Sequence, residues 1–174
     1  SPMCIAGVFG GENSGVTNKT SKIFLESAYF NPSDIRTSSQ NHQLKTDASY
    51  RFERGIDPNI TIYALKYAAL LICKYSGGAV TSKVYDTYPK EIENQNIEFN
   101  LERINQLAGH NFNKNEIIKI LNSLDIEVKE KKSVLVANVP PYRVDVTREA
   151  DILEEILRVY GYNNLKISKS NKSN

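Results

Sequence analysis

The chain has 174 residues, of which 40% are hydrophobic and 24% charged, and its formal net charge is +2. This length accommodates one or two small hydrophobic cores, and with neither a long apolar run nor a signal-peptide series we expect a cytoplasmic protein without membrane contact. The mild net charge does not indicate nucleic-acid binding, although residues 1–90 carry ten basic against seven acidic residues.

Two strands are expected before residue 31. Met3 to Phe9 is apolar and ends at Gly10-Gly11, which predicts a buried strand followed by a turn or by close approach to another molecule. Alternation over Lys22 to Phe30 predicts a second strand that sets Glu26 among apolar neighbours. A carboxylate in that setting must be paired or lie in a pocket, because an unpaired buried charge is costly.

Two helices and a third strand follow. Asn31-Pro32-Ser33-Asp34 offers a capping side chain, a proline and an acid in the order of a helix start, and predicts a helix to about His42. Asp57-Pro58 repeats this start, and apolar residues at helical spacing as far as Tyr75 predict a helix with a broad buried face. Val80 to Tyr88 alternates as a strand.

The stretch between the two helices, Thr46 to Gly55, reads TDASYRFERG. It is too polar for a core strand and too irregular for an amphipathic helix, so its density of polar groups indicates a site or a shared surface. A solvated loop with a few ion pairs is the alternative. Arg51 and Arg54 are suited to contact phosphates, and pairing with neighbouring acids explains them equally well.

A domain boundary is expected where residues 90–96 become polar after Pro89. We therefore expect an α+β protein with two small mixed domains, residues 1–90 and 91–167, and a disordered tail at 168–174. The second domain should be winged-helix-like, because it reads in order as strand, two helices, hairpin and helix. Its expected elements are Ile97 to Leu101, Leu101 to Ala108, Asn113 to Leu124, Val128 to Glu130 paired with Val134 to Val139, and a last helix capped by Thr147 that ends near Tyr160.

Four acids, Asp145, Asp151, Glu154 and Glu155, form the densest cluster of like charges, and the last three share one helical face. Carboxylates so close repel one another unless a cation lies among them, and oxygen ligands of this kind suit Mg²⁺. The alternative is a solvated face on which neighbouring arginines neutralise the acids.

A second set of residues, Gly10, Glu26, Thr46 and Ala48, has the chemistry of a small pocket. A glycine pair, a strand carboxylate and a Thr-Asp-Ala turn can surround a ligand whose phenol hydroxyl donates a hydrogen bond to Glu26. Such a pocket rejects phenylalanine, because phenylalanine would leave a buried acceptor unpaired.

No catalytic residue is predicted. The sequence pairs no nucleophile with a base and has no zinc-ligand spacing or phosphate-binding glycine loop. His42 is interpreted as a polar surface residue, and Cys4 and Cys73 as buried, reduced thiols.

Four motifs, GVFGGENSGV, LESAYFNP, TDASYRFERGIDP and PPYRVDVTREADILEEILRVYGYNN, resemble the phenylalanyl-tRNA synthetase beta subunit family. The first three are similar to the second half of its editing module and the fourth to the domain that follows. The resemblance implies a cytoplasmic ligase that joins phenylalanine to its tRNA using ATP, as a tetramer of two alpha and two beta subunits. It implies that the alpha subunit performs this chemistry and that this chain does not bind the ATP, while the beta subunit supplies assembly surface, tRNA contacts and hydrolysis of mischarged tyrosyl-tRNA.

The resemblance also assigns roles to single residues. It places Gly10 and Glu26 in the amino-acid pocket for editing, makes Thr46 and Ala48 its shape and selectivity determinants, and gives the four acids to a magnesium site shared with the alpha subunit. The family's editing module begins upstream of Ser1, so this chain alone is expected not to edit. A stand-alone nucleic-acid-binding or scaffold module, and an independent hydrolase with Glu26 as its base, are the alternatives.

Overall fold

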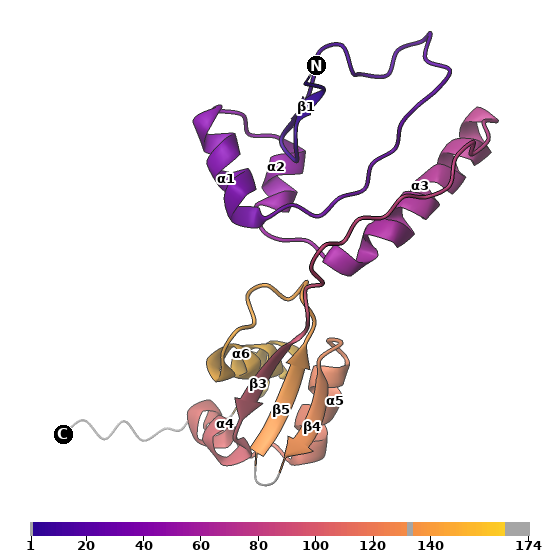
Figure 1. Ribbon diagram of the computed structural model, residues 1–174. Helices are drawn as coiled ribbons and strands as arrows, with labels where there is room; N and C mark the ends of the chain where they lie inside the picture. Colours follow the sequence, from indigo (N-terminus) through magenta and orange to yellow (C-terminus); the bar gives the residue numbers. More distant parts are fainter. Residues whose placement is uncertain (1, 132–133, 166–174) are drawn as a thin grey trace. The chain divides into compact units, whose positions relative to one another are not determined.

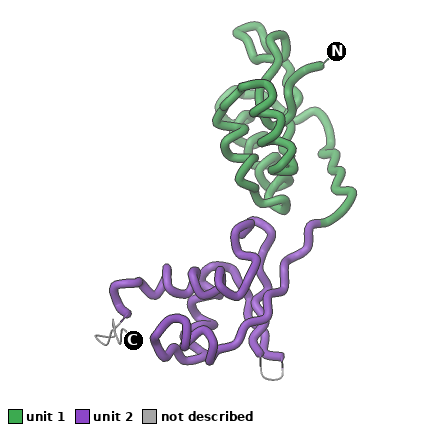
Figure 2. Tube along the Cα trace, turned by 90° about the vertical axis from the view of Figure 1, so that its left-hand side faces the viewer, with its two compact units in different colours: residues 1–91 green, residues 92–174 purple. Residues whose placement is uncertain are grey.

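The computed structural model describes residues 2–131 and 134–165 and divides the chain into two compact units, residues 1–91 and 92–174 (Figure 2). The predicted tail at 168–174 lies outside the described residues. Each unit combines helices with a small antiparallel sheet, so the α+β prediction is confirmed (Figure 1). No described helix has the length and apolar content that crossing a bilayer requires.

Unit 1 begins with a short hairpin instead of the single strand predicted over residues 3–9. Strands β1 (Cys4–Ile5) and β2 (Phe9–Gly10) pair antiparallel, and the chain turns between them at Gly7 with φ of +68°. Glycine fits here for a second reason, because a Cβ at Gly7 would lie 2.5 Å from Cδ1 of Ile35. The turn therefore packs closely against the first helix.

Helix α1 (Pro32–Asn41) confirms the predicted start, since the backbone N–H of Ser33 donates to Oδ1 of Asn31 at 2.9 Å. The polar stretch after it was expected to be irregular, and that expectation is wrong. Residues Asp47–Phe52 form helix α2, because Thr46 and Ser49 cap its first turn reciprocally.

The strands predicted over Lys22 to Phe30 and Val80 to Tyr88 are also wrong, as neither segment pairs with another strand in the part of the chain that the structure describes. Alternation of apolar and polar residues does not make a strand without a partner for the backbone groups. Exposed Phe24 and Tyr85 show that the alternating apolar residues do not all reach a core.

A 3₁₀ turn, η1 (Pro58–Ile60), leads into α3 (Thr61–Ser76), which ends at Gly77 with φ of +70°. The helix is found where predicted, but its expected buried face is not, because no described side chain of α3 is buried. Tyr63 and Tyr67 are 66% and 53% exposed and stack with ring centroids 6.0 Å apart. Cys4, predicted to be buried, is exposed as well.

Unit 2 follows the predicted order of strand, two helices, hairpin and helix (Figure 1). Its sheet has the order β3-β5-β4, with both neighbouring pairs antiparallel. The elements are β3 (Gln95–Phe99), α4 (Leu101–Ala108), α5 (Lys114–Asn122), β4 (Glu127–Lys131), β5 (Val134–Val139), α6 (Glu149–Tyr160) and the 3₁₀ turn η2 (Tyr162–Asn164).

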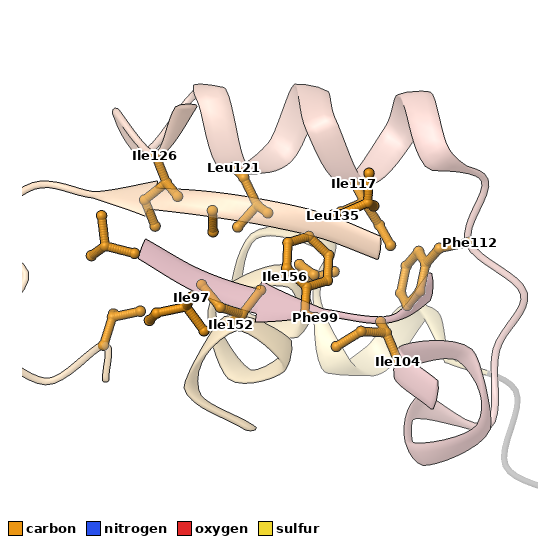
Figure 3. Close-up of a cluster of buried hydrophobic side chains, with 13 residues drawn as sticks. Ile97, Phe99, Ile104, Phe112, Ile117, Leu121, Ile126, Leu135, Ile152 and Ile156 are labelled. Atoms are coloured by element: carbon orange, nitrogen blue, oxygen red, sulfur yellow. The ribbon is translucent and has the colours of Figure 1, made fainter. Parts of the chain in front are cut away.

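The core of unit 2 forms where its helices cover the sheet, as Figure 3 shows. Phe99 and Leu135 from the sheet meet Ile104, Ile117 and Ile156 from three helices, and the isoleucines are fully buried. Burial of one such side chain stabilises a fold by roughly 1.5–3 kcal/mol, so this cluster holds α4, α5 and α6 in place. The acidic helix α6 is thereby anchored on its apolar side.

Candidate functional site

A cleft of about 470 Å³ opens in unit 1. Its walls come from the β1–β2 hairpin, the segment before α1, helix α2 and the residues from there to the start of α3. The lining residues are Cys4, Ile5, Gly7, Val8, Phe9, Gly10, Glu26, Ser27, Ala28, Phe30, Ala48, Phe52, Ile56, Ile60, Thr61 and Ala64.

Three of the four residues in the predicted pocket line this cleft. Gly10 comes from β2, Glu26 from the extended segment before α1, and Ala48 from the first turn of α2. Thr46 does not line the cleft, but its hydroxyl donates a hydrogen bond of 2.6 Å to the carbonyl oxygen of Val8, which does. Segments separated by up to 38 residues in the chain are thus brought together.

Aromatic and aliphatic side chains make the cleft apolar. The rings of Phe30 and Phe52 meet edge to face with centroids 4.9 Å apart, while Ile5 and Val8 come from the hairpin. Glu26 is exposed and brings a carboxylate to this apolar surface. An apolar cleft with one acidic acceptor suits a ligand that has a hydrophobic body and a polar hydrogen-bond donor.

The four acids predicted as a magnesium site differ in their surroundings. Asp151 closes the first turn of α6: its Oδ2 accepts from the backbone N–H groups of Thr147 at 2.9 Å and Arg148 at 2.8 Å. The Arg148 guanidinium donates to the other oxygen at 3.1 Å. Chiefly this guanidinium, and then the Thr147 N–H, lower the pKa of Asp151 from its ordinary 3.8 to about 2.

Glu155 is buried and is bound by two arginines. Its Oε2 accepts from Nη1 of Arg143 at 3.3 Å and from Nη2 of Arg158. Nη2 of Arg143 also donates to the carbonyl oxygen of Leu124 at 3.1 Å, so this pair ties α6 to the end of α5. Arg143 therefore has a structural role in unit 2.

Asp145 and Glu154 are exposed. Together with the hydrogen-bonded Glu155, which has the largest effect, their charges raise the pKa of Arg158, so all three acids lie within electrostatic reach of one guanidinium. Within residues 2–131 and 134–165, no three His, Cys, Asp or Glu side chains are grouped so that they could hold a metal ion. As arranged here, the four acids do not fit a complete magnesium site.

Three lysines of the hairpin and of α5 are paired with acids in the described part of unit 2. Lys129 and Lys131 of β4 lie 3.3 Å from Glu127 and Glu98, and Lys114 of α5 lies 2.7 Å from Glu130. A winged-helix protein that binds nucleic acid needs unpaired positive charge on its recognition helix or hairpin. These pairs therefore do not favour the alternative of a stand-alone nucleic-acid-binding module.

Sequence reasoning missed Ser39 and Ser49, which are 4% and 2% exposed. Ser49 exchanges hydrogen bonds with Thr46, and the hydroxyl of Ser39 donates to the carbonyl oxygen of Leu44 in the turn before it. One signal for Ser49 was present, because a Ser three residues after a Thr is a variant of the capping box. No signal in the sequence marked Ser39.

Comparison with known proteins assigns both units to domains found in one class of enzyme. Residues 1–77 match the model of the B3/4 domain, and residues 97–162 match that of the tRNA synthetase B5 domain. The class is thus the tRNA synthetases. Within it, the chain belongs to the family of phenylalanine–tRNA ligase beta subunits.

The similarity to individual members extends over nearly the whole chain. The phenylalanine–tRNA ligase beta subunit of Bacteroides fragilis is 46% identical over 172 residues, which are 98% of this chain and 21% of that protein. The Porphyromonas gingivalis subunit is 46% identical over 96% of this chain and 20% of its own length. The chain thus spans about a fifth of the length of these relatives.

A solved structure is also similar in sequence. The crystal structure of an N-terminal fragment of the phenylalanyl-tRNA synthetase beta subunit from Pyrococcus horikoshii is 30% identical. The match covers 42% of this chain and 21% of that chain, with a TM-score of 0.39.

Proposed function

We propose that unit 1 contributes an amino-acid pocket at which a phenylalanine–tRNA ligase removes tyrosine from mischarged tRNA by hydrolysis. The complete enzyme attaches phenylalanine to its tRNA using ATP, in the cytoplasm, as a tetramer of two alpha and two beta subunits. The alpha subunit carries out that synthesis and binds the ATP. Unit 2 serves subunit assembly and tRNA contact.

The cleft around Glu26 is the observation that supports this pocket. An aromatic ring would be buried against Phe30, Phe52 and the hairpin, while a para-hydroxyl at the end of the ring would donate to the carboxylate. A hydrogen bond to a charged acceptor contributes about 1.5–3 kcal/mol, or roughly a ten- to hundredfold preference. Phenylalanine lacks the donor, so its correct product would be spared.

Filling the cleft tests the proposal. Ala48 is exposed at the first turn of α2, so Ala48→Trp adds an indole to the cleft without disturbing buried packing. In the complete enzyme we expect tyrosyl-tRNA deacylation to fall at least about tenfold while phenylalanylation of tRNA is retained. A Trp at exposed Thr37 of α1, which does not line the cleft, is the control.

The proposal would be wrong if Ala48→Trp deacylated tyrosyl-tRNA as fast as the unaltered enzyme. Loss of deacylation together with equal loss of phenylalanylation would also count against it, because the substitution would then act on the whole enzyme and not on an editing pocket.

For magnesium, we propose that only the exposed pair Asp145 and Glu154 faces the ion and that the alpha subunit supplies the remaining ligands. Mg²⁺ usually takes one or two carboxylates and keeps several waters, so two exposed acids are enough from this side. Asp151 and Glu155 are already bound by backbone N–H groups and arginines. Their part is to fix α6, on which Glu154 lies.

A further inference from the structure

One side of helix α3 presents aromatic and basic side chains to solvent. Tyr63, Tyr67 and Leu70 are 66%, 53% and 60% exposed, and Lys66 and Lys74 are exposed as well. These five residues recur at helical spacing and therefore share one side of the helix, which we call the tyrosine–lysine face. Large apolar side chains that gather in water mark an interaction site more often than a single one does.

The two tyrosines are held in a defined arrangement. The rings of Tyr63 and Tyr67 are nearly parallel, with an interplanar angle of 5° and centroids 6.0 Å apart. Each ring nevertheless keeps more than half of its residue surface in water. Rings ordered in this way can stack against another planar group with little further loss of side-chain entropy. Nucleobases are such groups, because every base has a π-face.

The charge around this face is positive. Residues 58–85 contain three lysines and neither aspartate nor glutamate. Nζ of Lys74 lies 5.6 Å from the ring centroid of Tyr75, and Nζ of Lys83 lies 5.2 Å from that of Tyr85, so the lysines alternate with exposed aromatic rings. A matching partner has to offer negative charge and flat apolar groups together, and a single-stranded nucleic acid offers both.

The tyrosine–lysine face adjoins the cleft of unit 1. Ile60, Thr61 and Ala64 line the cleft at the start of α3. Tyr63 is three residues after Ile60 and Tyr67 three after Ala64, a spacing that makes each pair neighbours on the helix surface. In a mischarged tRNA the amino acid is esterified to the last nucleotide of a single strand. An amino acid in the cleft would therefore bring the end of that strand to the start of α3.

We propose that the tyrosine–lysine face binds single-stranded RNA, with bases stacked on Tyr63 and Tyr67 and phosphates close to Lys66 and Lys74. That the strand is the 3′ end of a tRNA whose amino acid occupies the cleft rests on the function proposed above. The binding of RNA by α3 does not, so the two are tested by separate measurements.

Tyr63→Ala combined with Tyr67→Ala removes both rings and leaves the lysines, and because both rings face solvent the fold should be retained. The probe is a fluorescein-labelled single-stranded RNA of about ten alternating cytidines and adenosines, a length that spans one small binding surface. In the 174-residue chain we expect its Kd, measured by fluorescence anisotropy, to rise at least about tenfold. Phe24→Ala removes an 87% exposed ring of unit 1 outside α3, and this control should bind as the unaltered chain does.

Lys66→Gln combined with Lys74→Gln tests the charge of the face. Two lysines that contact phosphates of a single strand contribute about −1.4 to the slope of log affinity against log salt concentration. The slope should become shallower by about this amount. Lys19→Gln combined with Lys22→Gln changes two exposed lysines of unit 1 outside α3 and should leave the slope as it is.

The proposal is overturned if the unaltered chain does not bind the RNA at about 1 mM protein, or if neither double variant of α3 weakens binding. Failure of the complete enzyme to assemble when α3 is altered, with RNA binding by the chain retained, would also overturn it, because the face would then bind a protein.

In the complete enzyme, Tyr63→Ala combined with Tyr67→Ala should raise KM for tyrosyl-tRNA deacylation, and Phe24→Ala should not. An unchanged KM would overturn the placement of the tRNA end on this face. If the unaltered enzyme does not deacylate tyrosyl-tRNA, the proposed function fails, and the anisotropy measurement still decides whether α3 binds RNA.

Discussion

Single residues of the acidic helix α6 have different tasks, although their charges are alike. Glu155 is buried between Arg143 and Arg158, whereas the adjacent Glu154 faces solvent. Nε of Arg143 is buried without a hydrogen-bond partner in the described residues. Its guanidinium therefore depends on the contacts of its two other nitrogens, to Glu155 and to Leu124.

Removal of the Glu155 carboxylate should be costly. For a fully buried pair the loss of one partner costs about 3–5 kcal/mol, and because Arg158 is half-exposed we expect about 2 kcal/mol for Glu155→Ala. Glu154→Ala, one residue earlier, should change the free energy of unfolding by less than about 0.5 kcal/mol. Urea denaturation of the two variants measures both changes in the free energy of unfolding. Equal changes would refute the claim that Glu155 stabilises the fold through its buried ion pairs.

At the scale of secondary structure, capping side chains mark where most of the described α-helices begin, although α3 begins without one. Asn31, Thr46, Asn100 and Asn113 each accept a hydrogen bond from a backbone N–H in the first turn of the helix that follows. At α6 the start of the helix is capped by Asp151, whose carboxylate accepts hydrogen bonds from the backbone N–H groups of Thr147 and Arg148 before the helix.

The Asp151 cap makes the stability of unit 2 depend on pH. Asp151→Ala should lower the free energy of unfolding by about 1 kcal/mol at pH 7, with or without magnesium. Because folding lowers the pKa of Asp151 from 3.8 to about 2, its charge contributes stability above pH 4 that is lost as the pH falls through 2. Thermal unfolding of the unaltered chain and of Asp151→Ala at pH 7, 4 and 2 should show the difference between their free energies of unfolding becoming smaller as the pH falls. A difference that does not change with pH would contradict the role of the Asp151 carboxylate as a cap.

The sequence predicted the elements of unit 2 better than those of unit 1, for a physical reason. In unit 2 the apolar residues are buried within the unit itself, so periodicity and capping signals agree with the packing. In unit 1 the apolar face of α3 and the alternating residues of the predicted strands do not reach a core. Periodicity therefore predicted burial and strands there that the structure does not have. Helix α2 was missed because its first turn is held by hydroxyl groups and not by an apolar face.

Only part of the candidate site was predicted from the sequence, because the rest depends on contacts between segments that are distant in the chain. Gly10, Glu26 and Ala48 were grouped from the sequence, and the structure brings them to one cleft. The indirect position of Thr46 and the supporting serines depend on contacts between segments distant in the chain, which residue spacing does not reveal. The hydrogen bonds that hold the carboxylates of Asp151 and Glu155 could likewise not be predicted from a sequence segment rich in acidic residues.

At the scale of the whole molecule, the chain consists of two units of different kinds. Among the described residues, unit 2 has a continuous core of thirteen buried hydrophobic residues, whereas the buried apolar residues of unit 1 are Val8, Ile35 and Pro58. Unit 1 is held largely by hydrogen bonds and by close packing around the hairpin. The cleft thus lies in the unit with fewer buried apolar side chains.

Deacylation of tyrosyl-tRNA by the complete enzyme carrying Glu26→Gln is the most direct test of this account. Glu12→Gln removes another exposed acid of unit 1 that does not line the cleft, and serves as the matched control. We expect deacylation to fall about four- to tenfold in Glu26→Gln alone, because the amide oxygen still accepts a hydrogen bond but lacks the charge that strengthens it, with phenylalanylation unchanged. If Glu26→Gln and Glu12→Gln both deacylate at the rate of the unaltered enzyme, the cleft is not the tyrosine pocket.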